Sequence, residues 1–248
     1  MKTLFLDLET SPNLAYVWSL WDSRIGINQL VSTTEVICFG ARWGNSKKVI
    51  FKSVHHDGKK AMLDEMHRLL DEADVVVGWN SATFDTKHMM REFVENGYLP
   101  PSPYKDLDLM RVVKSRFRFP SNKLDYVAQR LGLGKKNHHE GHTLWIKCMN
   151  NDKAAWKVME QYNIQDVVLL EKLYKKLLPW IKQPINLSLM KKDRNGFVCP
   201  TCSKSSLMSK GFRYTTTGAY QRYICKACGA YATDTRSVIP HSKLKHLA

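Results

Sequence analysis

Two carboxylates share one short apolar segment near the N-terminus. Asp7 and Glu9 lie in the run 4–10, which reads LFLDLET. Because side chains alternate along a strand, both carboxylates point to the same side. In a buried strand two such charges repel each other, and a divalent ion such as Mg²⁺ or Mn²⁺ would relieve that repulsion. The segment therefore predicts either a metal site or a strand end at which both acids reach solvent.

A second acidic position lies on the apolar side of a long helix expected over 152–178. Asp166 falls on the apolar stripe of this helix, and Tyr162 precedes it by one turn on the same side. A buried charge without a partner is costly. Either the phenol and the carboxylate act on a common point inside the protein, or the helix is rotated so that Asp166 reaches the surface. The stripe itself consists of Ala155, Met159, Leu169, Leu170, Leu173 and Leu177.

A third acidic position follows the short apolar strand expected over 74–79. The chain then turns through Asn80 and Phe84, and a helix starts with Asp85 in its first turn. Asp85 is a candidate metal ligand. An acid in the first turn of a helix also interacts favourably with the helix dipole, so this position alone has two interpretations.

Alternating strands and helices must position these acids. Apolar runs and helical spacing predict an α/β fold over residues 1–180, with a loop rich in tryptophan after the first strand. The expected strands are 3–9, 35–43, 47–54, 74–79 and 105–109, and the expected helices are 59–72, 84–96, a short one after 109, 121–131 and 152–178.

The three acidic motifs resemble those of the DEDD (DnaQ-like) exonucleases and occur in the same order. The motifs are Asp7-x-Glu9, Asn80-x-x-x-Phe84-Asp85 and Tyr162-x-x-x-Asp166, and the last resembles the tyrosine-bearing (DEDDy) branch. The resemblance covers about residues 1–180. It implies a ribonuclease H-like fold with a mixed five-stranded sheet flanked by helices.

The resemblance also implies roles for these residues with two Mg²⁺ or Mn²⁺ ions. Asp7 would bridge the ions, Glu9 and Asp166 would complete one metal site, and Asp85 would hold the second ion. Tyr162 would orient the attacking water, because an unperturbed phenol is a poor base near neutral pH. Two divalent ions about 4 Å apart stabilise both the attacking and the leaving oxygen of a phosphodiester.

Four of the six cysteines form two CxxC pairs near the C-terminus. Cys199 and Cys202 are separated from Cys225 and Cys228 by 22 residues, which leaves room for a hairpin through 216–218. Thiolates in this pattern bind Zn²⁺, and the segment 197–236 resembles the zinc ribbons of transposases and topoisomerases. This ribbon either contacts nucleic acid, docks a protein such as a replication or repair partner, or has a purely structural role.

The chain is basic, and its charge is unevenly distributed. The formal net charge is +15, and residues 183–248 carry 11 Lys and Arg against 2 Asp and Glu. This asymmetry indicates a polyanionic partner such as nucleic acid. We expect a linker over 181–196 and a basic tail over 237–248. No apolar run is long enough to span a membrane, and the acids near the N-terminus argue against a signal peptide, so an intracellular, cytoplasmic protein is expected.

Several further side chains are candidates for contact with nucleic acid, each with a structural alternative. The basic stretch 111–136, which ends in Lys135 and Lys136, either contacts phosphates or forms an ordinary solvated surface. Tyr16, Trp18 and Trp21 either stack on bases or pack in the core. The cluster 138–142 (HHEGH) does not have the spacing of a helical metal motif, and it either contacts substrate phosphate or is a plain polar loop. Individual contact candidates are Asn80, Phe84, Lys123, Arg213, Arg222 and Tyr223.

These patterns predict a metal-dependent 3′–5′ exonuclease whose zinc ribbon aids binding, with DNA favoured over RNA and single-stranded 3′ ends as substrate. An endonuclease or RNA-processing nuclease with the same site is an alternative. A nucleic-acid binding protein that has lost catalysis is another, although all four carboxylates and the tyrosine are present.

Overall fold

The structure is a computed structural model that describes the chain except for residues 20, 22, 23, 45, 138, 139, 183–185, 191–197 and 240–248. The chain divides into two compact units, one of Lys2–Leu173 and one of Met1 with Tyr174–Ala248. Most of the expected linker and of the expected basic tail lies outside the described residues. No helix among the described residues is long and apolar enough to cross a membrane.

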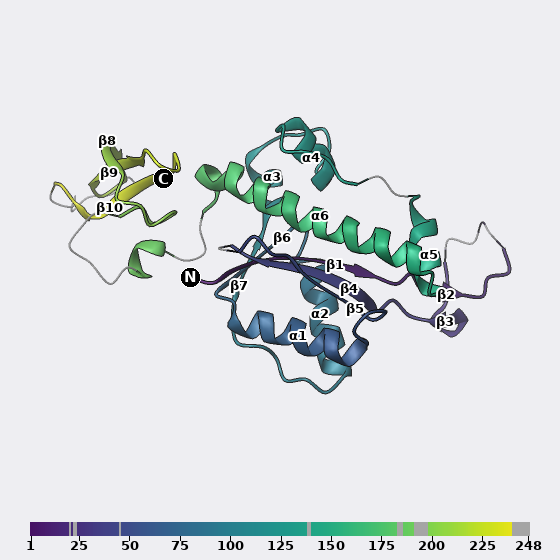
Figure 1. The fold of residues 1–248 in the computed structure, drawn as a ribbon. Coiled ribbons are helices and arrows are strands. Elements are labelled where there is room, and N and C mark those ends of the chain that lie inside the picture. The colour runs from purple at the N-terminus through teal and green to yellow at the C-terminus, as the bar shows by residue number, and fades with distance from the viewer. Residues whose placement is uncertain are drawn as a thin grey trace. The chain divides into compact units, whose positions relative to one another are not determined.

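A mixed five-stranded sheet forms the centre of the first unit (Figure 1). The strand order is β5-β4-β1-β6-β7, with β1 antiparallel to β4 and parallel to β6. Strand β1 is therefore central, as its continuous apolar run predicts. The strands are β1 (Thr3–Thr10), β4 (Val36–Trp43), β5 (Ile50–Ser53), β6 (Val75–Gly78) and β7 (Lys105–Asp108).

Helices cover both faces of this sheet (Figure 1). Helices α1 (Lys59–Glu72) and α2 (Asp85–Glu95) lie on one face and share a core with β1, β4 and β6. Helices α5 (His142–Met149) and α6 (Lys153–Leu177) lie on the other face and pack against β4 around the buried Trp156. Helices α3 (Leu109–Arg116) and α4 (Leu124–Arg130) precede them in the chain. The predicted mixed α/β sheet is thus confirmed.

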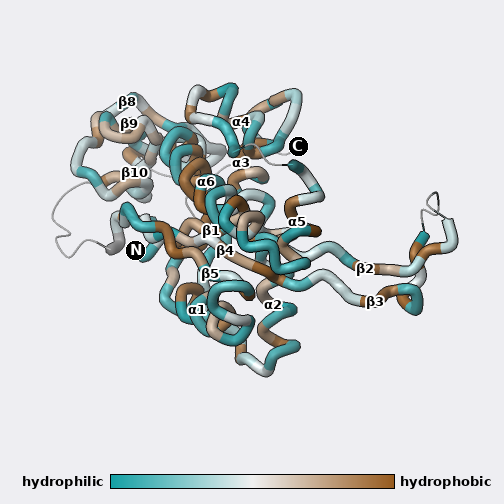
Figure 2. Tube along the Cα trace, turned by 45° about the vertical axis from the view of Figure 1, so that its right-hand side comes forward, coloured by the Kyte–Doolittle hydropathy of each residue, from teal (hydrophilic) through white to brown (hydrophobic). Residues whose placement is uncertain are grey.

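Two elements were not expected from the sequence. Helix α5 is only 8 residues long and follows a glycine-flanked polar segment, so its periodicity is weak. The tryptophan-rich segment expected to be a loop is an arm, which we define as the described residues of 11–34 (11–19, 21 and 24–34). It contains the short antiparallel strands β2 (Leu14–Ala15) and β3 (Leu30–Ser32), and it extends away from the main sheet (Figure 2). Two- and three-residue strands are too short to show an alternating pattern.

The second unit contains a three-stranded antiparallel sheet of order β10-β9-β8. Strands β8 (Leu207–Tyr214) and β9 (Ala219–Cys225) form the hairpin that the gap between the two CxxC pairs predicts, and β10 (Tyr231–Ser237) completes the sheet. Few apolar side chains are buried in it, and Ala219, Ala230, Cys199 and Cys225 are among them.

Candidate active site and metal centres

The carboxylates of β1 lie at the centre of the sheet, beneath helix α6. Asp7 pairs with Gly40 of β4, and Asn163 of α6 donates hydrogen bonds to the Asp7 carboxylate (2.9 Å) and carbonyl (3.2 Å). A Cβ at position 40 would collide with the Asn163 amide oxygen and with Val167. Gly40 therefore allows α6 to approach β1 closely enough for its side chains to meet Asp7.

Helix α6 turns its acidic position inward. Asp166 and Tyr162 are both buried, which excludes the alternative of a helix rotated toward solvent. Carboxylate oxygens of Asp7, Glu9 and Asp166 lie within 4.8 Å of one another. Asp7 and Glu9 remain half-buried, so the group lies at an accessible edge of the core and not in a sealed cavity.

The turn after β6 brings Asp85 next to β1. Asn80 has a positive φ of 66°, and its backbone N–H donates to Asp108 (2.9 Å), whose carboxylate also caps α3. The Leu8 N–H donates to the Asp85 carboxylate at 3.2 Å. Asp85 therefore lies beside the strand that carries Asp7 and Glu9, although it is not one of the three acids grouped within 4.8 Å.

The acids beside Asp85, Asp106 and Asp108, have structural roles. Asp106 accepts hydrogen bonds from the hydroxyls of Ser81 (2.7 Å) and Thr86 (2.8 Å), and Asp108 holds the turn described above. These bonds fix the strand–turn–helix geometry in which α2 begins at Asp85.

Burial and mutual repulsion disfavour the ionised forms of these acids. Burial, followed by the charges of Asp166 and Glu9, raises the pKa of Asp7 well above its usual value. Burial raises the pKa of Glu9 to about 8 against the opposing charge of Lys136. Burial raises the pKa of Asp85 to about 7, against backbone hydrogen bonds that favour its charged form. Such a group of acids favours a cation among them.

Lys136 supplies one cation, and sequence reasoning did not assign it to the site. Its ammonium group donates hydrogen bonds to Asp166 and to the Tyr162 hydroxyl (2.9 Å), and lies 4.9 Å from the Tyr162 ring centroid. Burial opposes its charge, but the interactions with Asp166 and Tyr162 together outweigh burial and raise the pKa of Lys136. Its signal in the sequence was its place in the basic stretch 111–136, for which an ordinary solvated surface was the alternative to phosphate contact.

Trp145 of α5 is the second residue that sequence reasoning missed. Its side chain donates a hydrogen bond to the Glu9 carboxylate, and its ring meets the Tyr162 ring edge to face with centroids 6.0 Å apart. Trp145 thus contacts both a candidate metal ligand and the candidate water-orienting residue. No sequence signal could have found it, since α5 itself was not expected.

The donor set of this group fits a hard divalent cation. Asp7, Glu9 and Asp166 offer only carboxylate oxygens, which are the ligands that Mg²⁺ and Mn²⁺ prefer, and their spacing is short enough for one ion to bind all three. Asp85 beside β1 adds a fourth carboxylate.

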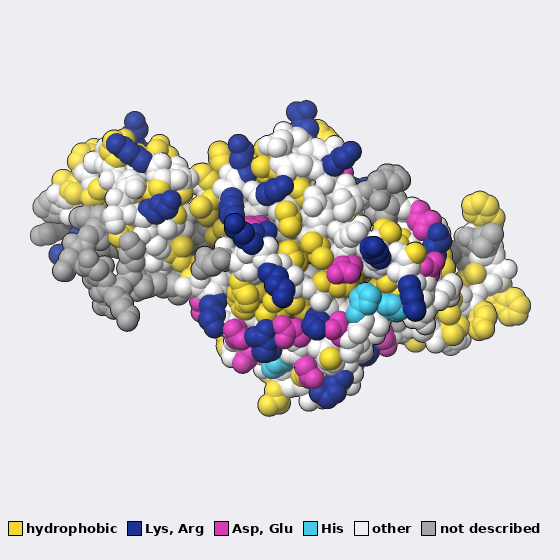
Figure 3. All heavy atoms as spheres, in the orientation of Figure 1, with side chains coloured by type: hydrophobic (Ala, Val, Ile, Leu, Met, Phe, Trp, Pro, Cys, Tyr) yellow, Lys and Arg dark blue, Asp and Glu magenta, His cyan; other side chains and the backbone are white. Residues whose placement is uncertain are grey.

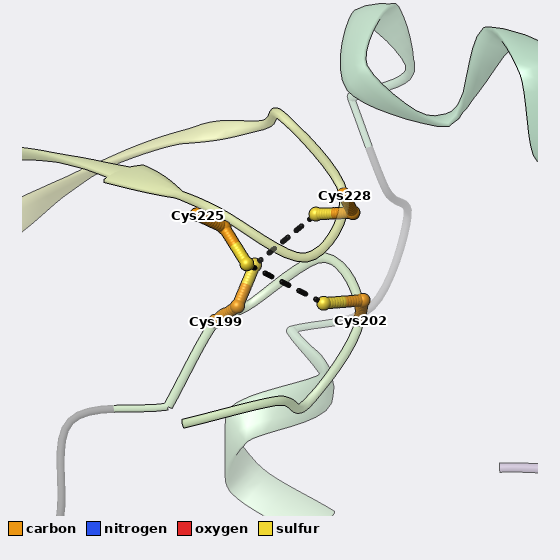
Figure 4. A group of neighbouring side chains, drawn as sticks. All are labelled: Cys199, Cys202, Cys225 and Cys228. Carbon is orange, nitrogen blue, oxygen red and sulfur yellow. Dashed lines mark hydrogen bonds between the residues drawn. The ribbon is translucent and has the colours of Figure 1, made fainter. Parts of the chain in front are cut away.

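The four cysteines of the second unit form a second candidate metal centre (Figure 4). The sulfurs of Cys199 and Cys228, and those of Cys202 and Cys225, are 3.7 Å apart. A tetrahedron of sulfurs about 2.3 Å from a zinc ion has edges of about 3.8 Å. The observed spacing therefore fits tetrahedral Zn²⁺ without movement of the chain.

The two CxxC turns have the same backbone construction. The Ser203 N–H donates to the Cys199 carbonyl (2.9 Å), and the Gly229 N–H donates to the Cys225 carbonyl (2.8 Å). Both donors have a positive φ, 60° and 76°. This repeated turn aims both sulfurs of each pair at one point, which is what a zinc knuckle requires.

The predicted nucleic-acid contacts lie in different settings. Asn80 is part of the turn before α2, where its side-chain oxygen accepts a hydrogen bond from the Thr83 hydroxyl (2.6 Å). Phe84 is exposed, and its ring contacts the His88 ring. Lys123 is exposed at the start of α4. In the second unit, Arg213 and Arg222 are exposed on the sheet, whereas Tyr223 is half-buried. Residues 138 and 139 of the polar cluster lie outside the described residues.

Comparison with known proteins establishes the class of this fold. Residues 4–178 match the RNase_H superfamily, and the chain belongs to that superfamily. None of the curated proteins matches the sequence. Among solved structures, the chain resembles a family B DNA polymerase from the hyperthermophilic archaeon Pyrobaculum calidifontis, with a TM-score of 0.57 and 18% identity. The match covers 72% of this chain and 24% of the polymerase, and it shows the fold alone.

Proposed function

We propose that this protein is a metal-dependent 3′–5′ exonuclease of the DEDDy branch that acts on single-stranded nucleic acid ends, with DNA as the favoured substrate. The observation that carries the proposal is the convergence of Asp7, Glu9 and Asp166 within 4.8 Å beside Tyr162. Superfamily membership supports a nuclease reaction at these carboxylates. The basic character of the chain supports a polyanionic substrate.

Asp7, Glu9 and Asp166 would hold one divalent ion, and Asp85 would help to hold another. Bound Mg²⁺ or Mn²⁺ supplies charge stabilisation for the attacking and leaving oxygens of a phosphodiester. Asn163 orients the Asp7 carboxylate, and the Trp145 N–H orients that of Glu9. These bonds limit the reorganisation that the ligands would need when an ion binds.

Tyr162 acts as a hydrogen-bonding group that orients the attacking water. Burial and the charges of Asp166 and Glu9 raise the pKa of its phenol, so it stays protonated at neutral pH and is not a general base. Lys136 contacts the Tyr162 hydroxyl and fixes its position. The same ammonium adds positive charge where a phosphate must approach the acids.

The second unit contributes affinity for the strand through a zinc ribbon. Cys199, Cys202, Cys225 and Cys228 would hold one structural Zn²⁺. Exposed Arg213 and Arg222 lie on a sheet with exposed aromatic side chains, which is a combination suited to single strands. A replication or repair protein is a further candidate partner for this sheet.

The proposal is tested with the full chain and 5′-labelled single-stranded DNA or RNA, in the presence of Mg²⁺, Mn²⁺ or EDTA. We expect a ladder that shortens from the 3′ end with either metal and no reaction in EDTA. Asp7→Asn should abolish the ladder, whereas Asp64→Asn, at an exposed acid of α1, should leave it unchanged. Cleavage of a circular single strand would instead indicate the endonuclease alternative, and inactivity with every substrate would indicate a binding protein.

A further inference from the structure

The arm presents large aromatic side chains to solvent. Trp18 is 98% exposed, Trp21 is 93% exposed and Tyr16 is 80% exposed, which excludes the core-packing interpretation of these residues. Hydrophobic side chains gather at the end of this arm in the space-filling view (Figure 3). Three large aromatic side chains exposed on one short segment indicate an interaction site.

The described part of the arm has an ordered construction. Its base is held by the Ser11 N–H donating to the Glu35 carbonyl (2.8 Å) and by the Thr34 hydroxyl donating to the Ser11 carbonyl (2.6 Å). Farther out, the Tyr16 N–H donates to the Gln29 carbonyl, and the Gln29 side chain donates back to the Tyr16 carbonyl. Tyr16 therefore stands on a hydrogen-bonded scaffold, and Trp18 and Trp21 follow it closely in the chain.

The arm is continuous with the carboxylate site. It begins two residues after Glu9, and a hollow of about 370 Å³ lies between its base and α5. This volume is within the range of small-ligand sites. Trp145, which contacts Glu9 and Tyr162, forms part of the wall. The hollow is lined by Thr10, Ser11, Pro12, Gly141, His142 and Trp145.

The lack of net charge over residues 11–34 indicates that the arm contacts the bases of a nucleic acid and not its phosphates. Residues 11–34 contain one acidic and one basic residue, Asp22 and Arg24, although the whole chain carries +15. A surface without net charge gives no attraction to phosphates, whereas aromatic rings stack on unpaired bases of any sequence. The imidazole and indole at the hollow offer the same kind of planar contact.

We infer that the arm and the hollow form a track for unpaired nucleobases, along which the strand passes before its 3′ end reaches the carboxylates. Bases close to the end occupy the hollow beside His142, and bases farther along stack on Tyr16, Trp18 and Trp21. This inference rests on the proposed exonuclease function. It adds that the substrate must be unpaired over several nucleotides and long enough to reach the arm.

The test compares the double variant Trp18→Ala/Trp21→Ala with the wild type and with Leu99→Ala, which removes an exposed apolar side chain outside the arm. Exonuclease KM for a long single strand should rise roughly tenfold or more in the double variant, since loss of base stacking has that effect. Hydrolysis of a chromogenic thymidine 5′-phosphodiester, which cannot reach the arm, should be unchanged. His142→Ala should weaken binding of short and long strands alike.

A binding measurement separates this inference from the proposed function. Anisotropy of a fluorescent single strand is recorded in EDTA with Asp7→Asn alone and with the arm variant added. Weaker binding by the arm variant would support the track, and if the wild-type chain also degraded no strand with Mg²⁺ or Mn²⁺, only the exonuclease proposal would be overturned. Unchanged KM and binding in an active nuclease would overturn the track. A wild-type dimer in size-exclusion chromatography that becomes monomeric in the double variant would also overturn it, because a second copy would then cover the aromatics.

Discussion

The carboxylates and the cysteines of this chain reach metal-ligand spacing by opposite routes. Asp7 lies on the first strand of the first unit and Asp166 lies on its last helix, so the two residues are far apart in the sequence. The close approach of that helix to the sheet at Gly40 brings them together. The four cysteines come from two nearly identical short turns. The first site is therefore a product of the folded core, whereas the second is formed by turns beside a sheet whose core is too small to be stable by itself.

The largest effect should come from loss of the cysteine site. Cys199→Ser should release zinc and unfold the second unit, because structural zinc contributes about 10–16 kcal/mol to small zinc-bound folds. Zinc content by mass spectrometry and the amide spectrum by NMR would show this. The first unit should keep its dispersed signals and its hydrolysis of the chromogenic ester. Global unfolding by this substitution would show that the two sites are not independent.

Loss of a carboxylate should remove activity and leave the fold intact. Asp7→Asn should lower the exonuclease rate at least about a hundredfold, in line with the removal of a key electrostatic group. The metal-free variant should nevertheless melt at or above the wild-type temperature at pH 8, because the substitution removes a buried repulsive charge. Calorimetry in EDTA checks this, and a clear loss of stability would indicate that Asp7 is needed for folding.

Substitution of Lys136 should lower the stability of the metal-free protein but raise its affinity for a metal ion. Lys136→Met leaves Asp166 buried without this charged partner, so the metal-free protein should lose up to about 3 kcal/mol of unfolding free energy. Mn²⁺ should bind more tightly, since the ammonium no longer competes for Asp166. Urea unfolding and isothermal titration calorimetry measure the two effects. Lys135→Met, at an exposed neighbour, is the matched control.

The pH dependence of the first unit tests the same group of acids in the unsubstituted protein. Glu9 has an ordinary pKa of 4.5 in the unfolded chain and about 8 when folded, so the folded state binds the extra proton between these values. The unfolding free energy of the metal-free protein should therefore fall as pH rises from about 4.5 to 8. Mn²⁺ should raise the melting temperature by more at pH 8 than at pH 5.5. Glu9→Gln should show a weaker pH dependence, and an equal dependence in both proteins would contradict the assignment.

The local residue pattern was sufficient to predict the elements that have a clear periodicity or a clear spacing of motifs. The inward stripe of α6, with Asp166 and Tyr162 on it, follows from helical spacing, and the β8–β9 hairpin follows from the gap between the CxxC pairs. Helix α5 and the arm did not follow, because one is short and polar at its start and the other contains very short strands.

The sequence by itself determined the residue types of the candidate ligands, the order of the three acidic motifs and the two CxxC spacings, because these depend on neighbouring residues within a strand, a helix or a turn. Only the tertiary structure decided that Lys136 contacts Asp166 and that Trp145 contacts Glu9. Those contacts join residues distant in the chain, and they arise when α5 and α6 pack on β4. Residue periodicity holds no information on such packing, because it reports which side of an element is buried and not what meets it there.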